Sequence, residues 1–218
     1  MMPCSQGLGF TVRRLLSSFE PEFEGLLRIY FEAHPEGELK PASALARMVE
    51  RPEYFFLVLM RGAAVAGFSI SICFRGSDAA LLEYMAVAAE QRNQGLGGLL
   101  FKETIECGAI AQRFLLVEVD SDKAASGYRA DLVRRKNFYR KLGCREIEGL
   151  VYIMPRVSSA LPPPLDMLVY KSALPQAIDK IRIRAWLEDC YSQVYQAPPD
   201  DRRIGLMLEP LPRAMRLI

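Results

Sequence analysis

The chain has 218 residues, of which 50% are hydrophobic and 25% are charged. This is ordinary usage for a globular protein and excludes a disordered or collagen-like chain. The 28 Lys and Arg residues nearly balance the 26 Asp and Glu residues, and the net charge of +2 argues against a dedicated nucleic-acid binder. A chain of this length forms one domain, or one domain with an appendage.

Cysteine and histidine usage excludes several kinds of site. The five cysteines form no CxxC pair, and their odd number argues against a disulfide framework. His34 is the only histidine, which excludes multi-histidine metal enzymes, and we predict no metal site. The longest wholly apolar run, Tyr54 to Met60, has seven residues, far fewer than the roughly 20 of a membrane helix. Because the first residues also lack a signal-peptide pattern, we expect a cytoplasmic protein that does not cross a membrane.

Hydrophobic periodicity predicts the order β-α-α-β-β-β in the first part of the chain. A helix is expected to begin at Pro21, with glutamates in its first turn, and to end at His34, which we interpret as a helix-end cap. A second, short helix is expected over 42–50, and residues 61–63 are expected to join two strands as a hairpin. The strands predicted in this part are 9–15, 54–61, 64–74 and 81–87.

Residues 96–171 predict a β-α-β-type arrangement. Together with the first part of the chain, this predicts a mixed-sheet α/β (α+β) fold. Gly143 has the position of a helix C-cap. Residues 176–195 carry an apolar stripe at helical spacing, so we divide the chain into a domain, 1–174, and a C-terminal helical extension, 175–218. The elements predicted before the extension are helices 96–110 and 132–142, strands 114–120, 145–154 and 166–171, and a loop over 121–130.

The segment from Leu81 to Leu100 carries the strongest functional signal. In it a strand runs into a short polar turn with glycines, and a helix follows. Backbone N–H groups at a helix N-terminus bind phosphate oxygens, and glycines let a ligand approach the backbone closely. We therefore predict a pyrophosphate or another anion on residues 94–98, with Arg92 as an added cation. The alternative is a glycine-rich helix start that only packs against the sheet.

The glycine spacing excludes two common phosphate-binding motifs and fits a third. It matches neither the Rossmann fingerprint nor the P-loop. It matches [RQ]-x-x-G-x-[GA], which stands here as Arg92-Asn93-Gln94-Gly95-Leu96-Gly97. A second block, Phe138-Tyr139-Arg140-Lys141-Leu142-Gly143, follows the pattern F-Y-x-K-x-G, although Cys144 then stands where an aromatic residue is usual.

With these two motifs, residues 9–171 resemble the GNAT acyltransferase superfamily. The resemblance implies a mixed, mostly antiparallel sheet of about seven strands, splayed at its two central parallel strands and flanked by helices. It also implies acetyl-CoA as the donor and direct attack of a primary amine on the thioester. The residues that it assigns to the cofactor are Met85, Val87, Arg92, Asn93, Gln94, Gly95, Gly97, Gly98 and Asn137.

Two residues are candidates for the chemistry of transfer. Tyr139, in the Phe-Tyr pair, has the family position from which a phenol protonates the departing thiolate, or it is only a packed aromatic side chain. Glu83, on the strand before the glycine turn, can relay a proton from the acceptor ammonium, or it is an ordinary surface charge. Glu118 is a rival, because a carboxylate in an apolar strand is costly to bury unless it is paired or functional.

Two other functions remain open from the sequence. One is a non-catalytic acyl-CoA-binding sensor on the same fold, and the other is a nucleic-acid-binding module that uses the basic stretch 129–145. We expect no nucleic-acid and no membrane partner, a small-molecule or peptide amine as acceptor, and a homodimer as one possible assembly. The acidic segment 20–38 suits a cationic amine but is also typical of ordinary helix surface.

Overall fold

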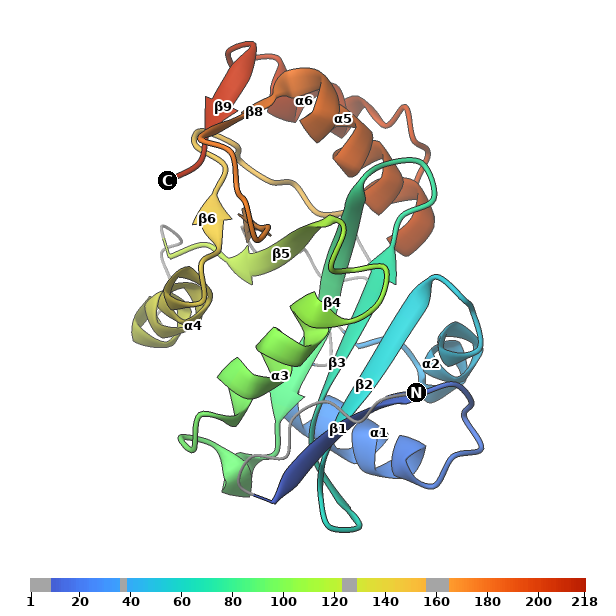
Figure 1. The fold of residues 1–218 in the computed structure, drawn as a ribbon. Helices are drawn as coiled ribbons and strands as arrows, with labels where there is room; N and C mark the ends of the chain where they lie inside the picture. The colour runs from blue at the N-terminus through green and yellow to red at the C-terminus, as the bar shows by residue number, and fades with distance from the viewer. Residues whose placement is uncertain (1–8, 36–38, 123–128, 156–164) are drawn as a thin grey trace. The chain divides into compact units, whose positions relative to one another are not determined.

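The computed structural model describes residues 9–35, 39–122, 129–155 and 165–218. Its main sheet is mixed and mostly antiparallel, as predicted, and has helices on its faces (Figure 1). The strands of this sheet are β1 (Phe10–Leu15), β2 (Tyr54–Arg61), β3 (Ala64–Cys73), β4 (Ala79–Val87), β5 (Phe114–Asp120), β6 (Arg145–Glu146) and β7 (Leu165–Tyr170). Their order is β1-β2-β3-β4-β5-β7-β6, with β4 and β5 as a parallel pair.

The helices and a second, two-stranded sheet complete the fold. The helices are α1 (Glu22–Ala33), α2 (Ala42–Val49), the 3₁₀-helix η2 (Ala89–Gln91), α3 (Leu96–Glu106), α4 (Arg129–Lys141), α5 (Lys180–Asp189), the π-helix η3 (Cys190–Val194) and α6 (Arg202–Leu208). The small sheet pairs β8 (Ala177–Asp179) with β9 (Ala214–Arg216).

The chain divides into two compact units, and each is described by itself. Unit 1 comprises residues 1–73 and 82–111, and unit 2 comprises residues 74–81 and 112–218. Residues within each unit contact one another more than they contact residues of the other unit. The division into a domain, 1–174, and an extension, 175–218, stays a prediction.

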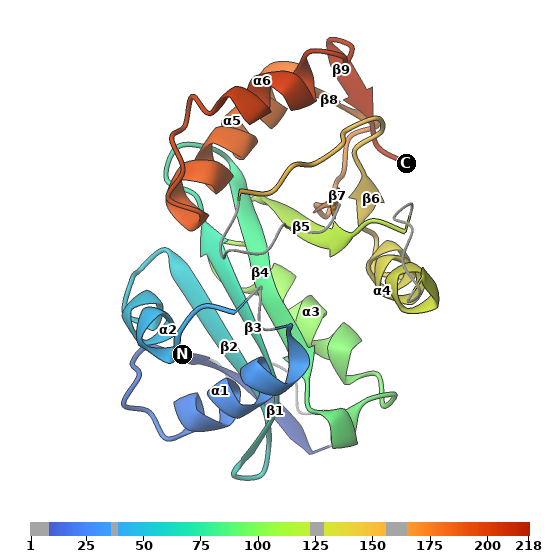
Figure 2. The ribbon, with the colours of Figure 1, turned by 180° about the vertical axis from the view of Figure 1, so that it is seen from behind.

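Unit 1 is a set of antiparallel strands with helices on both faces. Figures 1 and 2, drawn from opposite sides, show α3 in front of the strands in one view and α1 in front in the other. Every residue of β2 except Arg61 is buried, because a central strand covered on both faces needs apolar side chains in both directions. The predicted hairpin is confirmed: Arg61 pairs with Ala64, and Gly62 takes a positive φ of 59° in the turn.

Unit 2 is built around β5 and β7. These strands pair antiparallel from Leu115–Tyr170 to Asp120–Leu165, and β6 adds to the other edge of β7. In the C-terminal part, Ile183, Trp186 and Leu187 of α5 are fully buried. The apolar stripe predicted at helical spacing therefore packs within its own unit.

Two predicted elements are wrong in detail. The strand expected over 145–154 stops at Glu146, because Gly149 has a positive φ of 79° and the segment pairs with the chain end, where the Glu146 N–H donates to the Ile218 carbonyl. The helix expected over 176–195 begins only at Lys180. The preceding residues instead form β8, and the Asp179 side chain caps α5 by accepting a hydrogen bond from the Ile181 N–H at 2.7 Å.

Two helix ends also differ by several residues. Helix α3 ends at Glu106 rather than at residue 110, and α4 begins at Arg129 rather than at residue 132. Helix ends are the part of an element that periodicity locates least well. Most of the loop predicted over 121–130 lies outside the described residues.

A buried lysine fastens helix α4 to the strands of unit 2. The Lys136 side chain is 1% exposed, and its Nζ lies 2.7 Å from Asp166 and Glu146 and 3.0 Å from Asp122. Burial alone would lower the pKa of Lys136, but hydrogen bonds with these three carboxylates outweigh it and raise the pKa. Lys136 is thus a structural charge rather than a cation on a solvated helix face.

We expect Lys136→Met to lower the free energy of unfolding by about 3–5 kcal/mol, because it leaves buried carboxylates without their counter-ion. Urea denaturation measures this loss. Lys141→Met, on the exposed side of the same helix, is the matched control and should change stability by less than about 0.5 kcal/mol.

The pH dependence of stability provides a second test of the ion pairs of Lys136. The hydrogen bond from Lys136 holds the pKa of Asp122 below its ordinary value. The wild type therefore has this stabilisation above the ordinary carboxyl pKa and loses it as the pH falls through the lowered one. The Lys136→Met variant has none to lose, so equal acid sensitivity of the two proteins would contradict the assignment.

Candidate functional site

The glycine turn predicted to hold an anion leads from β4 into α3. Asn93 and Gly95 both have a positive φ, 62° and 78°. Gly95 is the N-cap residue of α3 and has the left-handed conformation that favours glycine. Its carbonyl accepts the first helical hydrogen bond, from the Leu99 N–H at 3.2 Å. The chain can therefore pass from strand to helix within a few residues.

The first turn of α3 has N–H groups with no intrahelical partner. Leu96, Gly97 and Gly98 precede the first helical hydrogen bond, no side chain caps the helix, and no acidic residue lies in its first turn. A Cβ added to Gly95 would meet no atom within 4 Å, so the space beside it is open. Open space, unpaired donors and the positive end of the helix dipole together suit a phosphate or pyrophosphate.

Arg92 lies at the same end of the helix. Its side chain is exposed, and its Nε donates a hydrogen bond to the Val87 carbonyl at 3.2 Å. This contact uses one of the five N–H donors of a guanidinium. It fixes the arginine beside the last residue of β4, next to the glycine turn.

The side chains of Met85 and Val87 pack strand β4 against helix α3. Both side chains pack against an apolar cluster that includes Leu96 and Leu100 of the helix. The sequence analysis missed a third contributor, Gly67 on β3, where a Cβ would lie 2.9 Å from the Ala86 carbonyl oxygen. A glycine inside a strand marks such a close approach of two backbones, and this was the signal available.

Glu83 is buried and paired with a residue that the sequence analysis did not single out. Its side chain is 5% exposed, and its Oε1 accepts a hydrogen bond from the Lys40 ammonium. Its Oε2 is buried and has no hydrogen-bond partner among the residues that the structure describes. A buried carboxylate oxygen without a donor is costly, so a ligand or water that donates to it is favoured. The interpretation of Glu83 as an ordinary surface charge is wrong.

Aromatic side chains surround this ion pair. The Tyr84 ring lies 4.9 Å from the Tyr30 ring and 5.2 Å from the His34 ring, between centroids. The His34 Nδ1 lies 3.0 Å from the Tyr30 carbonyl oxygen at the end of α1, which confirms its interpretation as a helix-end cap. Unit 1 thus holds a carboxylate, an ammonium and an aromatic group close to the strand that precedes the glycine turn.

Tyr139, in unit 2, is a buried phenol. Its side chain packs edge-on against Phe138, with 5.0 Å between ring centroids, and the residue is 8% exposed. Burial raises the pKa of Tyr139 above that of an ordinary tyrosine, so the hydroxyl stays protonated at neutral pH. Burial also raises the pKa of Cys144 to about 12, which favours the thiol form over the nucleophilic thiolate at neutral pH.

The other predicted polar residues of unit 2 have different surroundings. Asn137 is exposed on α4, and its assignment to the cofactor stays a prediction. Glu118 accepts hydrogen bonds at both carboxylate oxygens, from the Tyr152 hydroxyl at 2.5 Å and from the Tyr195 hydroxyl. A carboxylate held in this way is occupied by the fold itself, which favours Glu83 as the candidate for chemistry.

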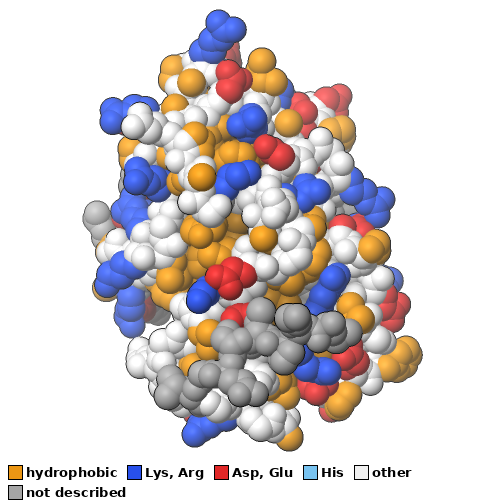
Figure 3. All heavy atoms as spheres, in the orientation of Figure 1, with side chains coloured by type: hydrophobic (Ala, Val, Ile, Leu, Met, Phe, Trp, Pro, Cys, Tyr) orange, Lys and Arg blue, Asp and Glu red, His pale blue; other side chains and the backbone are white. Residues whose placement is uncertain are grey.

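The basic stretch 129–145 is largely neutralised by acids. Besides Lys136, Arg134 pairs with Asp131 and Arg135 pairs with Asp120. On the face drawn in Figure 3, Lys and Arg side chains occur in several places with Asp and Glu side chains among them. These features favour a structural role for the stretch over nucleic-acid binding.

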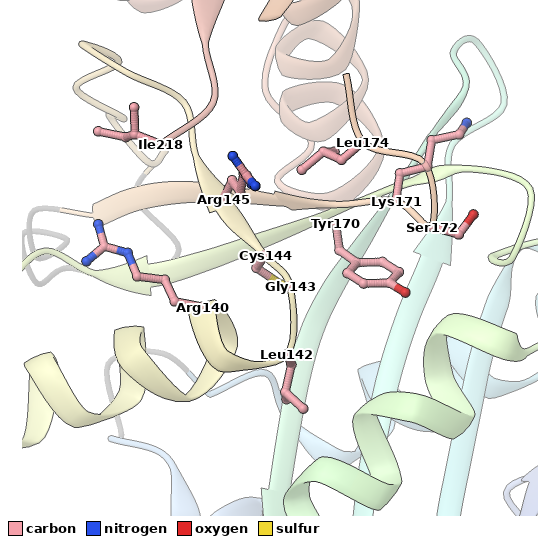
Figure 4. A pocket seen from close by; sticks show the side chains of 10 residues that line it. All are labelled: Arg140, Leu142, Gly143, Cys144, Arg145, Tyr170, Lys171, Ser172, Leu174 and Ile218. Atoms are coloured by element: carbon pink, nitrogen blue, oxygen red, sulfur yellow. The ribbon is translucent and has the colours of Figure 1, made fainter. Parts of the chain in front are cut away.

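A surface pocket of about 680 Å³ in unit 2 contains none of the predicted site residues (Figure 4). Arg140, at the end of α4, and Arg145, on β6, line it together with the Tyr170 ring. Arg140 is already paired with Glu146 at 2.9 Å.

Among the described residues, no group of three or more His, Cys, Asp or Glu side chains could hold a metal ion. In the same residues, no helix has the length and apolar character needed to span a membrane.

The C-terminal segment is tied to the turn that precedes β4. The Trp186 indole N–H donates to Asp78 at 2.9 Å, and the Gln193 side chain accepts from the Arg75 N–H at 3.2 Å. Gly76 lies so close to Asp189 that a Cβ would come within 2.8 Å of its carboxylate. Residues 175–218 are therefore packed within unit 2.

We expect Trp186→Ala to lower the free energy of unfolding by about 3–5 kcal/mol, because it leaves a cavity among fully buried side chains. Trp186→Phe keeps a ring against Phe114, 5.0 Å away between centroids, and removes the hydrogen bond to Asp78. It should lose less than the alanine variant.

The control is Ile181→Ala on the same helix, at a side chain that is 76% exposed. Urea denaturation of the three variants measures the order of the losses. A Trp186→Ala protein as stable as the control would show that α5 is a loosely attached appendage.

Comparisons with known proteins concern the family and the fold of this chain. Residues 52–146 match a family model described as an acetyltransferase (GNAT) domain, which spans both the glycine turn and the Phe-Tyr block. No curated protein is a significant sequence match.

Three solved structures illustrate the likeness of fold. A GNAT-family protein from Bacteroides thetaiotaomicron gives a TM-score of 0.69 at 18% identity, over 84% of this chain and 97% of that one. The ribosomal-protein-S18-alanine N-acetyltransferase from Escherichia coli gives 0.53 at 20% identity, over 76% and 96%. NAA60 from Arabidopsis thaliana, solved with acetyl-CoA, gives 0.56 at 12% identity, over 74% and 97%. At these identities the likeness shows a shared fold.

Proposed function

We propose that this chain, of which residues 52–146 match a GNAT acetyltransferase family model, transfers the acetyl group of acetyl-CoA to a primary amine by direct attack. The single observation that carries this proposal is the start of α3, where a left-handed Gly95, three N–H groups without intrahelical partners and Arg92 meet in open space. An anion is the ligand that such a helix start favours.

The residues of unit 1 would hold the cofactor as the resemblance implies. The N–H groups of residues 96–98, with Arg92 and the rest of the turn from Asn93, would bind the pyrophosphate. Main-chain groups of Met85 and Val87 would bind the pantetheine, and the resemblance also assigns Asn137 to the cofactor. When bound, the cofactor supplies a thioester whose carbonyl carbon an amine can attack.

Two side chains have proposed roles in the transfer. The Oε2 atom of Glu83 accepts a hydrogen bond from the acceptor ammonium, or from a water that relays its proton. Because Lys40 already neutralises this carboxylate, Glu83 binds and orients the amine more effectively than it removes a proton. Tyr139, protonated in its buried site, donates the proton that the departing thiolate takes up.

The acceptor is a small-molecule or peptide amine. One structural neighbour is named for an N-acetyltransferase reaction on a ribosomal protein alanine, and this supports peptide amines as one class to test. The four described cysteines form no disulfide, which supports our proposal of a cytoplasmic protein. Homodimerisation stays a prediction.

We expect the double variant Gly95→Ala, Gly97→Val to lower acetyl-CoA affinity at least tenfold, because the added side chains obstruct the pyrophosphate. Isothermal titration calorimetry measures the change. The matched control is Gly62→Ala, which introduces the same left-handed strain, at φ 59°, with equally open space in the hairpin of unit 1. Unchanged affinity in the double variant would reject the turn as the cofactor site.

We expect Tyr139→Phe to lower kcat by about 10²–10⁴-fold while acetyl-CoA affinity holds, because it removes a general acid and keeps the ring. Release of free thiol from acetyl-CoA over an amine panel measures kcat, and slow hydrolysis serves where no acceptor reacts. Tyr170→Phe, also in unit 2 but outside the predicted site, should leave the rate unchanged.

The pH profile separates this role from packing. Because the pKa of Tyr139 is raised, its acid form persists, and loss of its proton should not lower the rate below about pH 9. A variant with near-normal kcat and an unaltered profile would mean that solvent protonates the thiolate. Acetyl-CoA binding without turnover on any amine would instead favour the sensor function.

A further inference from the structure

The Lys40 ammonium lies against Glu83, the carboxylate that is proposed to orient the acceptor amine. The ammonium donates to Glu83 Oε1, and the two side chains are 21% and 5% exposed. The backbone of Lys40 is fixed as well, because its N–H donates to the Tyr30 hydroxyl at 2.7 Å. The chain thus holds one of its own primary amines against the carboxylate proposed to orient the substrate.

The surroundings keep this amine in place. The Lys40 Nζ lies 5.8 Å from the centre of the Tyr84 ring, a cation–π distance, and Tyr84 is held by Tyr30. Glu83 precedes Met85, the first residue proposed to contact the pantetheine, by two residues on β4, so the Cα atoms of these two residues are about 7 Å apart along the strand. All of these residues belong to unit 1.

We propose that Lys40 is a modification site, acetylated at Nζ by the same chain that carries it. This inference rests on the proposed function, since acetyl-CoA supplies the acyl group. The Lys40 ammonium first loses a proton to solvent through a water on Glu83 Oε2. The neutral amine then attacks the thioester carbonyl carbon, the new C–N bond forms and the C–S bond breaks. The second amine proton and the electron pair of the broken bond leave coenzyme A as a thiol.

Proximity favours this reaction over capture of an amine from solution. A nucleophile already held beside the reacting group acts at a high effective concentration. The product is an amide without charge, so the buried Glu83 carboxylate loses its counter-ion. The modified chain therefore presents a carboxylate that a cationic acceptor can neutralise.

The experiment incubates the purified full-length chain with acetyl-CoA and no amine acceptor. Intact mass spectrometry should show the gain of one acetyl group, and peptide mapping should place it on Lys40. Lys40→Arg, which keeps the charge, should abolish the gain, and Glu83→Gln should slow it at least tenfold. Lys102, 63% exposed on α3 of the same unit, is the internal control and should stay largely unmodified.

A second measurement tests the ion pair without acetyl-CoA. Competitive labelling with a trace of acetic anhydride should modify Lys40 several-fold more slowly than Lys102, because the Lys40 ammonium is paired with Glu83 and its side chain is 21% exposed, against 63% for Lys102. Glu83→Gln should raise the labelling of Lys40 and leave that of Lys102 unchanged. Equal labelling of the two lysines in the wild type would overturn the proposed arrangement.

Calorimetry separates failure of this inference from failure of the proposed function. If acetyl-CoA binds and Lys40 remains unmodified, Lys40 is only a counter-ion and the inference is overturned by itself. If acetyl-CoA does not bind, the proposed function fails and takes the inference with it. Equal modification of Lys102, or of the urea-denatured chain, would show unspecific chemical acetylation and would also overturn it.

Discussion

The left-handed backbone at Gly95 is the constraint on which the candidate site depends. A strand can lead into a helix within a few residues only if one residue reverses the chain, and a φ of 78° is accessible to glycine at little cost. The reversal leaves the N–H groups of the first turn of α3 without intrahelical partners. Apolar contacts of Met85 and Val87 with the helix keep these donors aimed in one direction. Backbone geometry and packing thus create a positive site with a single arginine beside it.

Buried charges in this chain differ in how completely they are hydrogen-bonded. In unit 2 the ammonium of Lys136 is surrounded by three carboxylates, and Glu118 is satisfied by two tyrosine hydroxyls. Both arrangements are complete, so they hold helices and strands together. In unit 1 the Glu83 carboxylate has one oxygen to which none of the described residues donates. Incomplete hydrogen bonding at a buried group is typical of a site that receives a ligand.

The C-terminal segment contributes to the fold through polar contacts as much as through its apolar stripe. Trp186 reaches Asp78 in the turn before β4, and Tyr195 reaches Glu118 on β5. Both contacts lie within unit 2. They attach the C-terminal segment to the turn before β4 and to β5. The segment therefore stabilises unit 2.

The sequence by itself determined the fold class, the order of the main helices and strands as far as β7, and the glycine turn. Strand 114–120 and the hairpin at 61–63 followed from local periodicity and turn residues, because those signals depend only on near neighbours. The motif from Arg92 to Gly97 was readable for the same reason, since its donors are consecutive in the chain.

Only the tertiary structure decided which distant residues meet. It brought Lys40 to Glu83 and Tyr195 to Glu118, over 43 and 77 positions of sequence. It ended β6 after Glu146 and started α5 only at Lys180, because both neighbouring segments pair with the last residues of the chain. Side-chain pairing over such separations has no periodicity and no fixed spacing. It depends on how the chain packs, and a residue's local sequence does not record its partner.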